Sequence, residues 1–379
     1  MKDIGIGLIG AGNIAQFHMQ GYNSVREAYG EVNPRFVVVA DLIEERAQSI
    51  ALRYNFEKVT ADWNDVINDP AVDCVLITTP NYVHAEMAIA AAKAGKHVMC
   101  EKPMAMDKAE GQAMVDAVKA AGVVSQVDFI YRKCPATEEA KKMIDSGALG
   151  DIITFRGWFD AAYKADPASP MEWRQYEKYA GTGALGDITA HVISLSDYLV
   201  NGQLGGIDEV CAVWDIAIPE RTSMDDPAKI DKVDTDDLNY VLVRYQNGRI
   251  GTMYASRVAT GHDCRMGYEI HGTKGTVKFN VERLNELELF LEDGDKQKRG
   301  FKTLSPNTAH GDYRHYSIYD DMGISYSNVM GIQAQSFLRA VAGGGTVDTD
   351  IAYGYYVDRV MEAMQKSIAE RRWVKISEV

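Results

Sequence analysis

The sequence lacks a disulfide pattern and long apolar runs. Its five cysteines among 379 residues are odd in number and widely spaced, and no pair has Cys-x-x-Cys spacing. This usage is typical of a reducing compartment. No apolar stretch approaches the ~20 residues that a membrane-spanning helix needs. Because the chain passes from Met1 almost directly into a strand, we see no room for a signal peptide and expect a cytoplasmic protein without membrane association.

Positive charge is also in deficit, with 40 basic against 54 acidic residues and a net charge of −14. Such a balance argues against nucleic acid as a partner and fits a small ligand. One segment concentrates acidic residues: Asp225, Asp226, Asp231, Asp234, Asp236 and Asp237. They lack the regular spacing and fixed glycine of a calcium loop, so we interpret the segment as a solvated excursion and expect no metal, a metal site being the alternative.

The first 130 residues alternate short apolar strands with helices. We expect strands at 4–9, 36–40, 59–60, 73–78, 97–100 and 123–127. Helices are expected between them, through about residue 28 and at 44–54, 63–68, 84–94 and 108–121. Asp107 is suited to begin the last helix and Gly122 to end it. This alternation predicts a doubly wound parallel sheet, the Rossmann type of α/β domain.

A glycine fingerprint follows the first strand: Gly10, Ala11, Gly12, Asn13, Ile14 and Ala15. Gly10 would allow the tight turn, Gly12 the close approach of a pyrophosphate, and Ala15 close helix–strand packing. A glycine-rich turn without a ligand is the plainer alternative. The position between strand and helix favours dinucleotide binding by Gly10, Gly12, Asn13 and Ile14.

Asp41 ends the second strand, where a carboxylate accepts hydrogen bonds from ribose hydroxyls and repels a 2′-phosphate. No Arg or Lys follows at once to hold such a phosphate. The sequence therefore favours NAD over NADP. The alternative is that Asp41 only begins the next helix.

The second half has a different pattern. We expect strands at 152–160, 208–218, 238–246, 249–259, 264–271, 276–279 and 285–291, helices at 332–343 and 352–371, and a last strand at 373–376. Hairpin signals between the strands predict a mostly antiparallel open sheet with helices on one face. The other face is free to pack against a second subunit, as a homo-oligomer (dimer or tetramer). We predict a dinucleotide-binding domain at 1–131 and an α+β substrate and oligomerisation domain at 132–379, sharing a rigid cleft.

An acid–base pair lies at the start of an expected amphipathic helix. Asp187 and His191 are four residues apart and fall on a polar stripe with Ser194 and Tyr198. The apolar stripe consists of Leu185, Ile188, Val192, Leu195 and Leu199. An imidazole beside a carboxylate is suited to general acid–base chemistry, a surface pair being the plain alternative.

Three motifs together resemble the glucose–fructose oxidoreductase / inositol dehydrogenase family. They are Gly10–Ala15, Cys100-Glu101-Lys102-Pro103, and the glycine segment that ends in Asp187-Ile-Thr-Ala-His191. Further matching positions are Thr79-Pro80-Asn81 with His84, Tyr131-Arg132, Trp173-Arg174 and Ser256-Arg257. Within the family the chain looks nearest to the inositol and levoglucosan dehydrogenase branch.

The resemblance implies site residues. Lys102, Asp187 and His191 correspond to the family's catalytic residues, Lys102 touching both the substrate hydroxyl and the nicotinamide ribose. The cofactor would also be lined by Thr79, Pro80, Asn81, His84 and Glu101, and covered by Trp173 and Arg174. Tyr131, Trp158 and Asp160 would face the substrate. His315, in an aromatic and charged loop, is a further substrate candidate, whereas we expect packing or surface roles for His18 and His97.

These assignments predict an NAD-dependent oxidoreductase acting on a secondary hydroxyl of a sugar, anhydrosugar or cyclic polyol. His191 would take the hydroxyl proton, Asp187 would orient it or the substrate, and Lys102 would stabilise developing negative charge. Inositol, a free aldose, an anhydrosugar and a glycoside all stay open as substrates. Two alternative functions are a non-redox enzyme that uses bound NAD transiently to cleave a glycoside, and a catalytically silent NAD-binding sensor.

Overall fold

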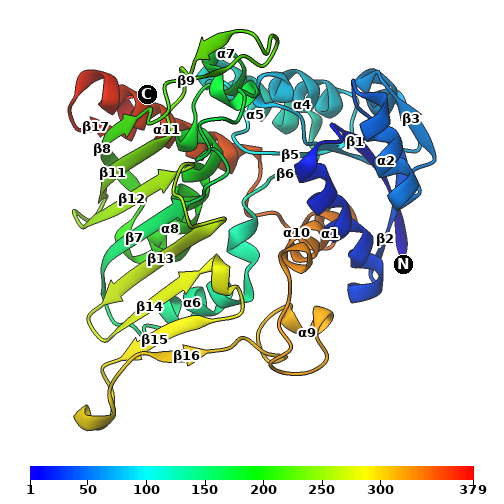
Figure 1. The fold of residues 1–379 in the computed structure, drawn as a ribbon. Helices are drawn as coiled ribbons and strands as arrows, with labels where there is room; N and C mark the ends of the chain where they lie inside the picture. Colours follow the sequence, from blue (N-terminus) through cyan, green and yellow to red (C-terminus); the bar gives the residue numbers. More distant parts are fainter. The chain divides into compact units, whose positions relative to one another are not determined.

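The computed structural model describes all 379 residues, which form two compact units (Figure 1). The first unit contains Met1–Ile130 and Ile324–Asp358, and the second contains Tyr131–Gly323 and Arg359–Val379. The first break lies next to the expected boundary at 131. The division differs from the prediction in one respect: residues 324–358, which we placed in the second domain, belong to the first unit. No helix is long and apolar enough to cross a membrane.

The first unit is built on a six-stranded parallel sheet in the order β3-β2-β1-β4-β5-β6. Its strands are β1 (Lys2–Ile9), β2 (Val32–Ala40), β3 (Lys58–Thr60), β4 (Cys74–Ile77), β5 (His97–Cys100) and β6 (Ser125–Val127). Its helices are α1 (Asn13–Tyr29), α2 (Glu44–Tyr54), α3 (Trp63–Asn68), α4 (His84–Lys93), α5 (Lys108–Ala121) and α10 (Tyr326–Val341). The predicted doubly wound sheet is confirmed. The strand order reverses between β1 and β4, and ligands of such sheets bind at the carboxyl ends of the strands near this point.

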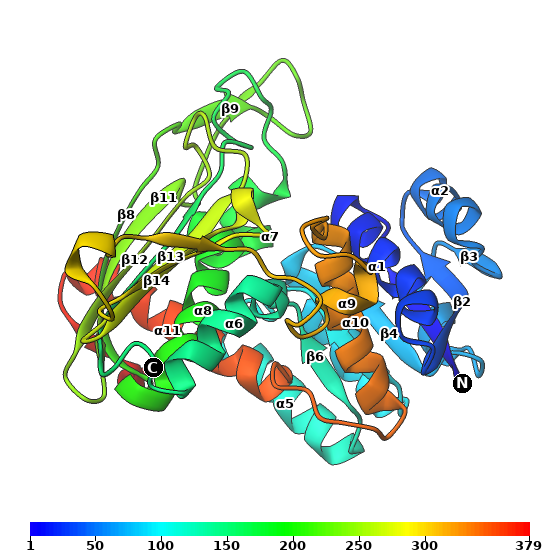
Figure 2. The same cartoon turned by 90° about the horizontal axis from the view of Figure 1, so that it is seen from below.

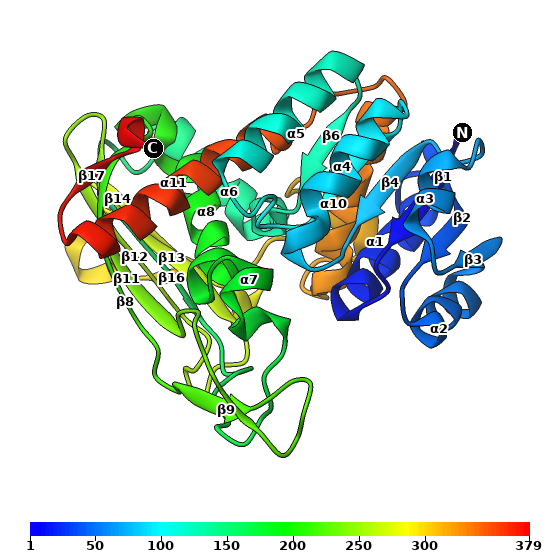
Figure 3. The same cartoon turned by 90° about the horizontal axis from the view of Figure 1, so that it is seen from above.

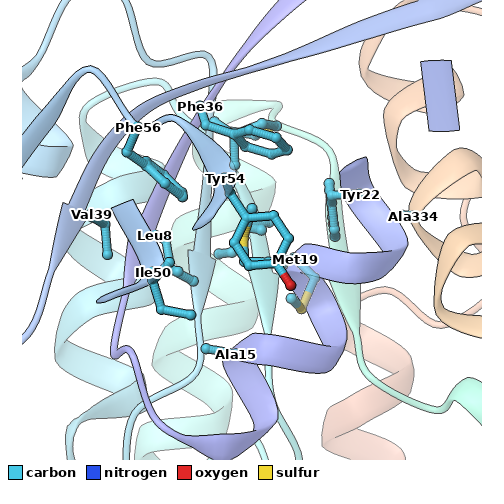
Figure 4. Close-up of a cluster of buried hydrophobic side chains, with 14 of the residues drawn as sticks. Leu8, Ala15, Met19, Tyr22, Phe36, Val39, Ile50, Tyr54, Phe56 and Ala334 are labelled. Carbon is cyan, nitrogen blue, oxygen red and sulfur yellow. The ribbon is translucent and has the colours of Figure 1, made fainter. Parts of the chain in front are cut away.

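Residues 324–358 join the first unit because α10 packs on α1, as Figure 2 shows. A Cβ on Gly21 of α1 would lie 2.7 Å from the carbonyl carbon of Met330, so glycine permits this close approach. Ala334, Phe337 and Leu338 of α10 are buried in the same apolar cluster as α1 and the sheet, part of which Figure 4 draws. The helix therefore completes the core of the first unit.

The second unit is built on a nine-stranded sheet in the order β16-β15-β14-β13-β7-β12-β11-β8-β17. Its strands are β7 (Ile152–Asp160), β8 (Ile207–Asp215), β11 (Leu238–Tyr245), β12 (Ile250–Ser256), β13 (Arg265–Gly272), β14 (Gly275–Asn280), β15 (Leu287–Leu291), β16 (Lys302–Leu304) and β17 (Val374–Lys375). Only β7 and β12 pair in parallel, so the predicted mostly antiparallel sheet is confirmed.

Helices cover one face of this sheet. Figure 2 shows α6 (Pro135–Asp145) and α8 (Ala190–Leu204) on the same side of the strands. A separate hairpin of β9 (Glu220–Thr222) and β10 (Ile230–Lys232) lies in the acidic segment (Figure 3). The remaining helices are α7 (Glu177–Ala180), α9 (Tyr313–Tyr316) and α11 (Ile351–Glu370), the last of which contains the third boundary between the units, after Asp358.

Candidate active site

The two glycines of the loop after β1 have different surroundings. The backbone requires glycine at position 10, whereas the space beside Gly12 is open. Gly10 has a φ of +92°, and a Cβ there would lie 2.9 Å from the carbonyl group of Thr78, so this position requires glycine. A Cβ on Gly12 would meet no atom within 4 Å. Gly12 is also the N-cap of α1 and offers no side-chain cap. The chain thus leaves room for an anionic group against the first backbone N–H groups of α1, where the exposed Asn13 and half-buried Ile14 begin the helix.

Asp41 lies directly against this loop. One carboxylate oxygen accepts the backbone N–H of Ala11 at 2.7 Å, and the other accepts that of Ile43 at 2.8 Å. The N-cap of α2 is Ile43 and not Asp41. The acid therefore bridges the glycine loop and the start of α2, which places a negative charge beside the cradle left by Gly12.

His84 joins the two loops that follow β4 and β5. Its Nε2 lies 2.9 Å from the Thr79 carbonyl and its Nδ1 lies 3.0 Å from the Pro103 carbonyl. The ring is fully buried, and this burial lowers the pKa of His84. We expected His84 to line the cofactor; the structure places it beneath the surface, between the Thr79–Pro80 loop and the cis Lys102–Pro103 peptide. Asn81, in the turn before α4, is also buried, while Thr79 and Pro80 are half-buried.

Beneath Lys102 lies a buried polar cluster of Glu101, His18, Asp128 and Gln333. His18 Nε2 is 2.7 Å from Glu101 Oε1 and 3.7 Å from Asp128 Oδ2. Gln333 Nε2 of α10 donates to Asp128 Oδ1, and the Lys102 backbone N–H donates to Glu101 Oε2 at 3.2 Å. His18 is buried, in agreement with the packing alternative, and its ring also takes part in this network. Glu101 is buried too, so it supports the Lys102 backbone from below.

Burial and mutual charge shift the pKa values of Asp128, Glu101 and His18 in this cluster. Burial, and then the charge of Glu101, raise the pKa of Asp128 to about 7. Burial opposes ionisation of Glu101, but the hydrogen bond and charge of His18 lower the Glu101 pKa to about 2. Burial alone would lower the pKa of His18, but its hydrogen bond to Glu101 and the nearby acids raise it. Below about pH 7 the negative charge of the cluster therefore lies on Glu101, while Asp128 holds a proton. We interpret the cluster as a hydrogen-bond network, because the 2.7 Å between His18 Nε2 and Glu101 Oε1 is a hydrogen-bond distance.

Asp128→Asn should flatten the pH dependence of stability. A folded-state pKa of about 7, above the ordinary 3.8, means that Asp128 stabilises the fold at low pH and that this contribution is lost as pH rises toward 7. His18 acts in the same direction because its pKa is also raised. We expect the wild type to lose roughly 2 kcal/mol of unfolding free energy between pH 5.5 and pH 8. Asn keeps a donor toward Glu101 without the proton, so the variant should lose much less.

Urea unfolding followed by circular dichroism at the two pH values measures this difference. Asp116→Asn is the matched control, because Asp116 is an exposed acid of α5 in the same unit. Equal pH dependence of the wild type and Asp128→Asn would show that Asp128 is already ionised in the folded protein.

In the second unit, His191 lies on a buried helix and not on a solvated stripe. A π-helical turn, Leu185–Thr189, contains Asp187 and precedes α8, so Asp187 and His191 do not lie on one regular α-helix. The predicted apolar stripe is buried as expected, but His191 is only 6% exposed and Ser194 only 1%. Ser194 has a buried partner, because Arg132 Nε donates to its Oγ at 2.8 Å. The alternative of a surface pair is therefore excluded for His191.

Two aromatic rings flank the imidazole. Tyr131 meets His191 edge-on with ring centroids 4.8 Å apart, and the Phe159 ring lies at 6.1 Å. Gly157 allows α8 to approach β7 so closely, because a Cβ there would lie 2.5 Å from a methyl of Val192. Tyr131 was predicted at the site and Phe159 was not. The alternation of side chains along strand 152–160 is the signal that identifies Phe159 once its neighbour Gly157 is known to face a helix.

The same alternation separates Trp158 and Asp160 from His191. Phe159 points to the face covered by α8, so its neighbours in β7 point to the opposite face. There Asp160 Oδ2 accepts from Arg265 Nη1 at 2.9 Å and from the Tyr254 hydroxyl at 3.0 Å. The structure therefore does not bring Trp158 and Asp160 together with His191, contrary to the expectation that they face one substrate. His315, on α9, lies 3.8 Å from Asp312, and its substrate role stays a prediction.

Asp187 is held by two donors. The Tyr163 hydroxyl donates to its Oδ2 at 2.6 Å, and Arg174 Nε lies 3.3 Å from the same oxygen. Arg174 also stacks on Trp173, with its guanidinium carbon 4.2 Å from the ring centre. Thr235 and Arg257 both donate to the Arg174 carbonyl, at 2.9 and 3.2 Å. Arg174 of the pair predicted to cover the cofactor thus contacts Asp187 in this structure.

The acidic segment contains two buried residues that organise the site. Asp236 accepts the backbone N–H groups of Gly183 at 2.7 Å and Leu185 at 2.9 Å, just before the π-helical turn. Burial raises its pKa above the ordinary value. Asp237 forms a 2.8 Å ion pair with Arg257, and both side chains are at most 1% exposed. The interpretation of the segment as a solvated excursion is therefore wrong for Asp236 and Asp237.

Comparison with known proteins decides the family. A family model described as an oxidoreductase family with an NAD-binding Rossmann fold matches residues 4–129, and the GFO/IDH/MocA C-terminal domain matches residues 137–278. The chain belongs to this oxidoreductase family. The resemblance drawn from the sequence motifs is confirmed.

Members of this family with named activities cover the whole chain. A levoglucosan dehydrogenase of Pseudarthrobacter phenanthrenivorans is 38% identical over 100% of both chains. A myo-inositol 2-dehydrogenase of Thermotoga maritima is 28% identical over 99% of both. A solved structure of levoglucosan dehydrogenase in complex with NADH and levoglucosan has a TM-score of 0.94 and 40% identity, and the match covers 99% of this chain and 100% of that one.

Proposed function

We propose that this family member is an NAD-dependent dehydrogenase that oxidises a secondary hydroxyl of a sugar, anhydrosugar or cyclic polyol. The observation that carries the proposal is a buried imidazole, His191, next to the turn that bears Asp187, in a chain matched over its full length by a levoglucosan dehydrogenase. That relative makes an anhydrosugar the first substrate to test. Inositols are the second, on the strength of the relatives that act on them.

The residues of the first unit fit a bound dinucleotide. The open space at Gly12 and the start of α1 would take the pyrophosphate, and Asp41 would accept the hydroxyls of the adenosine ribose. Thr79, Pro80, Asn81 and Lys102 would hold the nicotinamide half. When bound, NAD⁺ supplies the acceptor for the hydride that leaves the substrate carbon. Because Asp41 already places a negative charge beside the cradle, NAD is favoured over NADP.

Residues of the second unit would remove the proton from the substrate hydroxyl. His191, enclosed by the rings of Tyr131 and Phe159, accepts it as general base. Asp187, fixed by Tyr163 and Arg174, binds the substrate and orients the imidazole. Lys102 contributes positive charge where the oxygen becomes negative. The buried Glu101 network keeps the Lys102 backbone in place for this role.

The test measures NADH absorbance with purified protein, NAD⁺ or NADP⁺, and a panel of anhydrosugars, inositols, aldoses and glycosides. We expect NADH with NAD⁺ and one class of ring hydroxyl, and much slower turnover with NADP⁺. Release of a sugar from a glycoside without net NADH would replace the proposal with the non-redox alternative. Tight NADH binding without any turnover would favour the sensor.

We further propose that the protein works in the cytoplasm as a homo-oligomer. All five cysteines are free thiols, in keeping with a reducing compartment. The uncovered face of the nine-stranded sheet exposes apolar side chains that a second copy would bury: Val213, Tyr240, Leu242 and Ile250. A mass in solution above the 41.9 kDa of one chain, measured by light scattering, would support this arrangement.

A further inference from the structure

Tyr163 touches the catalytic acid and also presents its ring to solvent. It lies in the loop between β7 and the turn at Trp173, and its hydroxyl donates to Asp187 Oδ2 at 2.6 Å. The residue is 43% exposed, whereas Ala161 and Lys164 near it in the loop are buried. An aromatic face therefore stands open beside the carboxylate that is assigned to substrate binding.

The backbone around Tyr163 is held firmly. The Lys164 N–H donates to the Arg257 carbonyl at 3.0 Å, and the Lys164 carbonyl accepts Arg221 Nη2 at 2.5 Å. The Lys164 ammonium, 4% exposed, pairs with Glu172 at 2.9 Å. Arg221 is itself buried and also donates to the Asp166 carbonyl at 2.7 Å. Because buried charged groups anchor the backbone that follows Tyr163, and Asp187 accepts from its hydroxyl, the position of the side chain is fixed at both ends.

We propose that Tyr163 has two functions in substrate binding: its hydroxyl positions Asp187, and its ring forms an aromatic platform against which the carbon face of the sugar packs. The inference rests on the proposed function, since it assigns a substrate contact in that site. Neither the motifs nor the family resemblance pointed to this residue.

The chemistry of the pair supports both parts. Desolvation, and then the negative charge of Asp187, raise the pKa of Tyr163 well above its usual value, so the phenol stays protonated and donates. A hydrogen bond to a charged acceptor is among the strong ones, so its loss removes a strong constraint on the orientation of Asp187. Sugar rings present C–H groups on one face and hydroxyls at the edge. An aromatic face next to a carboxylate matches both surfaces.

Two variants separate the two functions. Tyr163→Phe removes the hydroxyl and keeps the ring, and Tyr163→Leu removes both. With the panel sugar that the wild type oxidises best, Tyr163→Phe should lower kcat about 10-fold with little change in the KM for sugar. Tyr163→Leu should lower kcat by the same factor. Its KM for sugar should be about fivefold higher than that of Tyr163→Phe. Tyr319→Leu, an exposed tyrosine of the same unit, is the matched control and should leave both constants unchanged.

A double variant tests whether the hydroxyl acts through Asp187. In an Asp187→Asn background, adding Tyr163→Phe should cost less than twofold in residual kcat, because the charged acceptor is already gone. Circular dichroism melts and NADH titration of each variant confirm folding and cofactor binding.

The outcomes are distinct. An active wild type with unchanged constants in both Tyr163 variants overturns the inference and leaves the proposed function standing. Equal KM values for Tyr163→Phe and Tyr163→Leu overturn the platform, and a full effect of Tyr163→Phe in the Asp187→Asn background overturns the positioning role. A wild type that oxidises no sugar of the panel overturns both proposals.

Discussion

Replacing His191 with alanine should lower kcat by about 10²–10⁴-fold while NADH binding is retained. The imidazole lies on α8 directly after the turn that bears Asp187, and the rings of Tyr131 and Phe159 beside it cannot take a proton at neutral pH. Without it, the hydroxyl proton of the substrate has no acceptor in the right place. His191→Gln is the companion variant, because it nearly fills the same space with a group that is not a base.

Initial rates of NADH formation measure this effect, and fluorescence titration with NADH measures cofactor binding. His262→Ala is the control: its half-exposed ring contacts Glu282 in the same unit. A kcat within threefold of the wild type in both His191 variants would remove His191 from the proton-transfer role. Loss of NADH binding together with activity would instead indicate a folding defect.

Asp237→Ala should be the most destabilising single substitution among the site's supporting residues. It leaves the Arg257 guanidinium buried without its carboxylate, which costs about 3–5 kcal/mol of unfolding free energy. It also removes the acceptor for the Ile218 backbone N–H at 2.9 Å. Because Arg257 donates to the Arg174 carbonyl, we expect activity to fall together with stability.

The pair Asp237→Ala with Arg257→Met identifies the cause. If the cost comes from an uncompensated buried charge, the double variant should be more stable than Asp237→Ala alone. Urea unfolding can be followed by tryptophan fluorescence, which reports mainly on the second unit because Trp158, Trp173, Trp214 and Trp373 lie there. Lys229→Ala breaks an exposed ion pair with Asp226 and should cost at most about 1 kcal/mol. Similar losses for Lys229→Ala and Asp237→Ala would show that burial adds nothing.

The features that the sequence predicted correctly are those with a local cause. Strand and helix periodicity placed the two sheets, and the α5 helix begins after Asp107 and ends before Gly122 as expected. The fingerprint at Gly10 and Gly12 depends on backbone conformation and lack of a side chain, which are properties of single positions. The motifs around Lys102 and His191 sufficed to identify the family.

The features that it missed depend on partners far away in the chain. The i+4 rule placed Asp187 and His191 on one stripe of a regular helix, whereas Asp187 lies in a π-helical turn and His191 in the α-helix that follows it. We predicted that the acidic segment is solvated, because a run of aspartates does not reveal which of them find buried partners. The partners of Asp236 and Asp237 are backbone N–H groups and Arg257, which lie elsewhere in the chain. Trp158 was assigned to the substrate because of its chemistry, whereas the direction of its side chain follows from the face on which β7 packs against α8.

The sequence by itself therefore determined the fold class and the family, while the roles of the glycine loop and of Asp187 and His191 stay predictions. Only the tertiary structure decided which polar groups are buried: His18 meets Glu101 across 83 residues, and Asp128 meets Gln333 across 205. It also decided that residues 324–358 complete the first unit. The physical reason is that backbone conformation responds to near neighbours, whereas burial of a charge is tolerated only where a distant segment supplies its partner.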